Sequence, residues 1–127
     1  SLNAPDFIIT SLDSTVNFCF NILPVQLEEG DTKTMSSQFQ NALRNVNPSI
    51  RISERVDNTA ADKGSEMSWF GFKGYALDGQ NYNRMYIIRM RKTVLHGIFN
   101  CPPRVRDQWE GIVEQCFQSV EELWDIL

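Results

Sequence analysis

The residues of this chain that could carry chemistry gather in one stretch, MYIIRMRKTVLHGIFNCPP at positions 85–103. It holds the only histidine, His96, and a cysteine, Cys101, and such a pair can act as general base and nucleophile. The two are five residues apart, however, and an odd separation along a strand points their side chains to opposite faces. Spacing leaves Cys19 open as a partner for His96. We expect His96 to be structural and the chain to have no catalytic residue.

No other catalytic signature is present in the sequence. There is no G-x-S-x-G motif and no phosphate-binding glycine loop, since the glycines of WFGFKG (69–74) precede no predicted helix. The acidic pairs Glu28–Glu29 and Glu121–Glu122 are typical of solvated charge. Three cysteines and one histidine match no zinc-binding spacing, so neither a metal nor another cofactor is expected. The sequence therefore predicts a protein that is not an enzyme.

Positive charge is concentrated in one segment of an otherwise acidic chain. Half of the twelve cations lie between positions 84 and 106, with no acidic residue among them: Arg84, Arg89, Arg91, Lys92, Arg104 and Arg106. These charges could serve solubility and protect a sheet edge. The alternative is a surface for an anionic partner such as an acidic protein segment, because arginine forks pair with carboxylates. Arg89, Arg91 and Lys92 are the candidate partner-binding residues of this segment.

An aromatic segment, SWFGF at 68–72, supplies a second candidate surface. In a strand, Phe70 and Phe72 share one face, whereas Trp69 lies on the other face with Tyr75. If the two phenylalanines meet the core, Trp69 and Tyr75 could form a partner-binding patch. Helices that cover the sheet could equally bury them, and the sequence leaves both interpretations open.

Composition limits the class of protein. A chain of 127 residues with 42% hydrophobic residues is typical of one globular domain. A net charge of −4 and a pI near 4.9 argue against a nucleic-acid partner. No apolar run approaches the roughly 18 residues of a membrane span. The three cysteines favour free thiols in the cytoplasm, although a removed signal or lipoprotein leader and a Cys101–Cys116 bridge stay open.

Hydrophobic periodicity predicts the elements that must position these residues. Apolar residues alternate in the expected strands and recur at three- and four-residue steps in the expected helices. Asp31 or Thr32 is the expected N-cap of the first helix. The prediction is one α+β domain over residues 1–127, an antiparallel sheet with a helix on each face or both on one. Its order is β-β-α-β-β-β-β-α, at 7–10, 16–23, 32–46, 49–56, 67–77, 82–91, 94–101 and 105–127.

This order resembles the PsbP-like fold, which is shared by photosystem II extrinsic proteins, a Ran-binding import factor, and bacterial lipoproteins and adaptors. The residues that carry the resemblance are NFCFNIL (17–23) and HGIFNCPP (96–103), followed by a helix with Trp109, Ile112 and Ser119. The resemblance implies a domain that binds other proteins, since few members are enzymes. We therefore expect a non-enzymatic interaction module of a bacterial cell, of adaptor, chaperone-like or immunity type. The alternative is a small-ligand-binding domain with a pocket between the sheet and the C-terminal helix.

Overall fold

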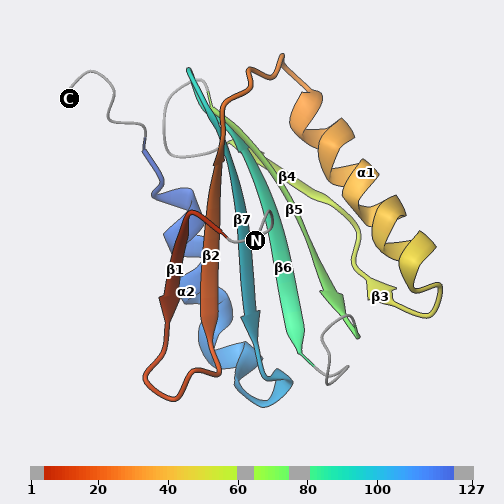
Figure 1. The fold of residues 1–127 in the computed structure, drawn as a ribbon, viewed down its shortest axis with the longest axis vertical. Helices are drawn as coiled ribbons and strands as arrows, with labels where there is room; N and C mark the ends of the chain where they lie inside the picture. The colour runs from red at the N-terminus through yellow and green to blue at the C-terminus, as the bar shows by residue number, and fades with distance from the viewer. Residues whose placement is uncertain (1–4, 60–64, 75–80, 122–127) are drawn as a thin grey trace.

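The computed structural model describes residues 5–59, 65–74 and 81–121. Within these residues, seven antiparallel strands form one sheet in the order β1-β2-β7-β6-β5-β3, and β4 also pairs with β5 (Figure 1). The strands are β1 Phe7–Thr10, β2 Asn17–Leu23, β3 Arg51–Ile52, β4 Val56–Thr59, β5 Glu66–Lys73, β6 Tyr82–Arg89 and β7 Val94–Cys101. Three strands of eight residues, β5, β6 and β7, form the centre of the sheet.

Two helices cover opposite faces of the sheet. Helix α1 spans Asp31–Val46, and α2 spans Arg106–Gln118 after a short 3-10 turn at Pro103–Val105. Figure 1 shows α1 beside β4, β5 and β6, and α2 behind β1, β2 and β7. The expected α+β architecture is thus confirmed, with one helix on each face. Among the described residues, no helix is both long and apolar enough to cross a membrane.

The larger core lies between α2 and the sheet. Phe117 of α2 stacks on Tyr86 of β6 at a centroid distance of 3.8 Å, and both side chains are fully buried. The ring of Phe117 lies directly over Gly97 of β7, where a Cβ atom would meet it at 2.8 Å from Cζ. Glycine in the middle of β7 therefore lets the helix approach the sheet.

The smaller core lies between α1 and the sheet. It contains Leu43 of α1, Phe70 and Phe72 of β5, and Met85 of β6. Phe70 and Phe72 thus point to α1, whereas Trp69 packs with the α2-side core, as the alternation predicts. Both faces of β5 and β6 are covered, which accounts for their long buried runs.

Three local features differ from the sequence prediction. The strand expected at 49–56 is two short strands, because the Ser53 amide donates to the Gly71 carbonyl and the Ser53 hydroxyl accepts from the Gly71 amide. The N-cap of α1 is Gly30, whose positive φ of 87° suits glycine, and not Asp31 or Thr32. Helix α2 ends at Gln118, so the expected helical positions Leu123, Trp124 and Leu127 lie outside the described residues.

Candidate functional site

The most unusual side chain of the molecule is Arg84 on β6, which is only 3% exposed. Its Nε donates a hydrogen bond to the Tyr82 hydroxyl at 2.8 Å, and its Nη1 donates to the Tyr86 hydroxyl at 3.1 Å. The guanidinium also lies over the ring of Trp69, 4.1 Å from its centroid. Strand alternation explains this cage, since residues 82, 84 and 86 share one face of β6 and Trp69 pairs with Tyr86 across the sheet.

Two glutamates of α2 balance the charge of Arg84. Glu110 lies 3.4 Å from Nη2 and Glu114 lies 3.6 Å from Nη1. Glu110 is held firmly, because Arg106 one helical turn earlier donates to the same carboxylate oxygen at 2.8 Å. The side chain of Glu114 is 59% exposed, and its ion pair with Arg84 is the longer of the two.

Burial and hydrogen bonding fix the charge states in this cage. Burial alone would lower the pKa of Arg84, but the hydrogen bonds to Tyr86 and Tyr82 outweigh it and hold the pKa above its ordinary value. Burial also raises the pKa of Tyr86 to about 12, although the hydrogen bond from Arg84 opposes this shift. At neutral pH the cage therefore contains a guanidinium cation and a neutral phenol.

A cavity of about 590 Å³ opens beside the cage, between α2 and the β3–β5 side of the sheet. Trp69, Gly71 and Tyr82 form part of its lining, together with the charged residues Arg51, Lys73, Arg84, Arg106, Glu110 and Glu114. Gly71 leaves room for the ring of Tyr82, since a Cβ atom there would lie 2.9 Å from the Tyr82 hydroxyl. This is the position, between sheet and C-terminal helix, in which a ligand pocket was the alternative expectation.

The structure separates the residues that the sequence proposed for partner binding. Arg89 is half-buried and donates to Glu66 of β5 at 2.7 Å, on the face that α1 covers. Arg91 and Lys92 are exposed and lie in the turn between β6 and β7, not on the strand. Trp69 lies on the opposite face, in the Arg84 cage, and Tyr75 lies outside the described residues. The described candidates therefore form no single surface.

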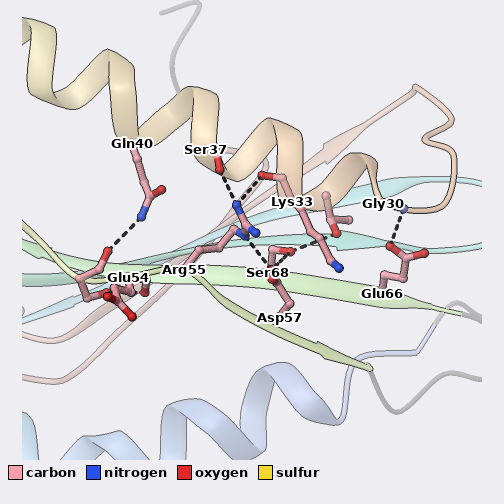
Figure 2. A network of polar contacts seen from close by, with 11 residues as sticks. Gly30, Lys33, Ser37, Gln40, Glu54, Arg55, Asp57, Glu66 and Ser68 are labelled. Atoms are coloured by element: carbon pink, nitrogen blue, oxygen red, sulfur yellow. Dashed lines mark hydrogen bonds and ion pairs between the residues drawn. The ribbon is translucent and has the colours of Figure 1, made fainter.

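A second polar network joins α1 to the sheet (Figure 2). Arg55 bridges Ser37 of α1 and Asp57 of β4, and Asp57 accepts a further hydrogen bond from Ser68 at 2.7 Å. At the start of α1, Glu66 accepts a hydrogen bond from the Gly30 amide at 3.0 Å. These contacts hold the segment after Ile52 and the segment before α1 against the sheet. The role of this network is therefore structural.

His96 faces α1 and stacks on Phe39 at a centroid distance of 5.4 Å. Its Nδ1 lies 3.3 Å from the Asn21 amide nitrogen, and burial lowers its pKa. Cys19 is one diagonal step away on the same face, yet burial raises the pKa of its thiol, which opposes activation as a nucleophile. Among the described side chains, His96 hydrogen-bonds to neither a carboxylate nor a thiol, and all three cysteines are free.

The free edge of the sheet is the main exposed apolar feature. β1 pairs only with β2 among the described strands, and Phe7, Ile8 and Ile9 are 57%, 57% and 61% exposed. The strand contains neither a charge nor a proline, which commonly protect such edges. Ile112 of α2 is also half exposed, on the same side of the helix as Trp109, whose ring contacts Phe18 of β2.

A pocket between the sheet and the C-terminal helix was the alternative expectation, but the sequence pattern indicated neither the Arg84 cage nor the β1 edge as a site. Arg84 and Arg106 were counted in the basic segment, but local sequence does not reveal which face of β6 a helix covers. The spacing of Arg106, Glu110 and Glu114 at four-residue steps was the available signal, because it places all three on one side of α2. The exposure of β1 depends on the order of strands in the sheet, which the sequence pattern does not contain.

Comparison with known proteins shows the fold alone. No family model matches the sequence, and no curated protein matches it. The structure is similar to PA94 of Pseudomonas aeruginosa, a protein of unknown function suggested to be a regulator, with a TM-score of 0.65 and 17% identity over 91% of this chain and 80% of that one. It is also similar to the cyanobacterial PsbP (CyanoP) of Synechocystis sp. PCC 6803, with a TM-score of 0.65 and 9% identity over 88% and 71%. The expected PsbP-like fold is therefore confirmed.

Proposed function

We propose that this protein is a non-enzymatic interaction module that binds an extended apolar segment of another polypeptide along the outer edge of β1. One observation carries the proposal: among the described strands β1 pairs with β2 alone, at the edge of a seven-stranded sheet, and it presents three apolar side chains that are each more than half exposed. Strand addition uses both components, because backbone hydrogen bonds give affinity and alternate side chains give specificity.

A partner polypeptide fits this edge better than a second copy of the chain. Two copies joined through β1 would share only four residues each, and stable interfaces bury roughly 1,200–2,000 Å² in total. A longer partner segment can continue past β1 to the exposed Leu12 in the following turn. The larger apolar contact then supplies the affinity.

The remaining features of the site agree with a binding role of adaptor or chaperone-like type. His96 is packed against Phe39 and lies beside Asn21, which agrees with a structural role for this side chain. The two similar structures described above are both of bacterial proteins, which supports a bacterial setting. The binding surface is thus β1 and not the expected Arg89, Arg91 and Lys92, since Arg89 is paired with Glu66 on the face that α1 covers.

The test is selection of binding peptides from a random library on the immobilised protein. Peptides rich in β-branched and aromatic residues are expected to bind the wild type and to lose about tenfold or more in affinity for Ile8→Lys, because lysine on an edge opposes strand addition. Val46→Lys is the matched control, since Val46 is an exposed apolar residue at the end of α1. Hydrogen exchange should slow at residues 7–10 in the peptide complex.

Two results would contradict the proposal. Peptides that bind Ile8→Lys as well as the wild type would place the binding surface elsewhere. A wild type that is dimeric by analytical ultracentrifugation, and that becomes monomeric with Ile8→Lys, would assign the edge to a second copy of the chain instead.

A further inference from the structure

The cavity beside Arg84 has a charge that contrasts with the rest of the molecule. The whole chain carries a net charge of −4, yet the lining has four cations and two carboxylates. The cations are Arg51 of β3, Lys73 of β5, Arg84 of β6 and Arg106 of α2. Among the described residues, neither Arg51 nor Lys73 forms an ion pair. The cavity thus has an excess of positive charge that no described side chain balances.

Arg84 is a rigidly held cation at the edge of this space. The hydroxyls of Tyr82 and Tyr86 hold its Nε and Nη1, and the Trp69 ring covers one face of the guanidinium. Tyr86 stacks on Trp69 in turn, with ring centroids 5.6 Å apart. A guanidinium fixed in this way loses little conformational entropy when it binds a carboxylate or phosphate.

Glu114 occupies the place that an external anion would take. Its carboxylate is 3.6 Å from Arg84 Nη1 and more than half exposed, and no described group donates a short hydrogen bond to it. Glu110, by contrast, is fixed by Arg106. A bound anion can therefore displace Glu114 into water at small cost while Glu110 stays in place.

We propose that this cavity is a binding site for a small organic dianion, one of whose acidic groups replaces Glu114 at Arg84 while the other lies between Arg51 and Lys73. The volume of about 590 Å³ is within the roughly 300–1,000 Å³ typical of small-molecule sites. Carboxylate and phosphate groups share the required chemistry, since both accept hydrogen bonds from arginine in a planar fork. The site is independent of the interaction surface on β1, which lies at the other edge of the sheet.

The experiment is an NMR titration at low ionic strength with succinate and, separately, with inorganic phosphate, while sodium chloride serves as the ionic-strength control. The Arg84 Nε–H and Trp69 indole signals are expected to shift and saturate with succinate. Succinate, which has two separate carboxylates, is expected to be the better ligand. Inorganic phosphate as the better ligand would overturn the proposal, because its single acidic group cannot lie both at Arg84 and between Arg51 and Lys73.

Variants with opposite expected effects make the test specific. Lys73→Ala should weaken binding by about tenfold, because it removes a charged contact. Glu114→Gln should tighten binding severalfold, because it removes the competing carboxylate. Two control variants make the same changes of charge away from the cavity: Lys33→Ala in α1 and Glu28→Gln in the loop before α1. Both should bind as the wild type does.

The proposal is overturned if chloride alone reproduces the shifts, or if Lys73→Ala binds like the wild type. It is also overturned if Glu114→Gln and Glu28→Gln tighten binding equally, because net charge alone would then explain the effect. None of these outcomes affects the β1 proposal, since no variant here lies on that strand.

Discussion

Arg84 joins three elements through one side chain: its own strand β6, Trp69 on β5, and the glutamates of α2. A buried cation of this kind is stable only while its partners are present. The aromatic cage around Arg84 should therefore contribute to the stability of the protein whether or not an anion binds in the neighbouring cavity.

Arg84→Lys is expected to destabilise the protein by about 3 kcal/mol, because lysine keeps the charge but cannot form the forked contacts to both tyrosine hydroxyls. Arg106→Lys is the matched control: Arg106 is half exposed, and its ion pair with Glu110 is worth less than about 1 kcal/mol. Urea denaturation of the three proteins measures the difference. Equal losses for the two variants would show that burial of Arg84 has no special energetic weight.

Two glycine-to-alanine substitutions are expected to change the stability of the protein in opposite directions. Gly97→Ala should cost about 2 kcal/mol, because the new Cβ atom meets the buried ring of Phe117. Gly111→Ala should stabilise the protein by about 0.5–1 kcal/mol, since Gly111 lies inside α2 with no atom within 4 Å of the new Cβ. Thermal unfolding monitored by circular dichroism measures both variants, and a neutral Gly97→Ala would mean that α2 can shift away from β7.

At the scale of elements, sequence periodicity predicts most strands and both helices. It places Phe70 and Phe72 opposite Trp69 correctly, because alternation fixes which side chains share a face. It does not predict the break between β3 and β4, which depends on the hydrogen bonds of Ser53 with Gly71 across the sheet. Nor does it predict the cage of Arg84, since a tertiary contact with α2 decides whether that face is covered.

The attachment of α1 should depend on pH through Glu66, which binds the Gly30 amide and Arg89. Burial alone would raise the pKa of Glu66, but these hydrogen bonds hold it below its ordinary value of 4.5. A carboxyl whose pKa is lower in the folded state stabilises the fold above pH 4.5 and loses that contribution as the pH falls further.

Glu66→Gln is accordingly expected to reduce stability by about 1 kcal/mol at pH 7. The difference from the wild type should shrink as the pH falls from about 4.5 towards 3, because the wild-type carboxyl then becomes protonated as well. Urea midpoints between pH 7 and pH 3 test this, with Glu28→Gln in the exposed loop as the control. A difference that is constant with pH would show that the contacts of Glu66 do not depend on its charge.

At the scale of the whole molecule, the sheet separates two hydrophobic cores. The free energy of local unfolding should decrease from the central strands to the β1 edge. β6 pairs with neighbours on both sides along all eight residues and is buried from Tyr82 to Ile88. β1 pairs on one side over four residues and buries no side chain. Local opening of β1 therefore exposes little additional apolar surface.

Hydrogen exchange in dilute, monomeric protein is expected to show this gradient: amides of β1 should exchange at least about tenfold faster than those of β6, whose exchange requires global unfolding. The amides of β2 bonded to β7 should be intermediate, because β2 keeps its seven-residue pairing with β7 when β1 opens. A dilution series distinguishes the alternatives. If β1 is as protected as β6 at every concentration, the edge is covered within the monomer and is unavailable to a partner. If that protection is lost on dilution, a second copy covers the edge, and the free strand required for partner binding exists only in the monomer.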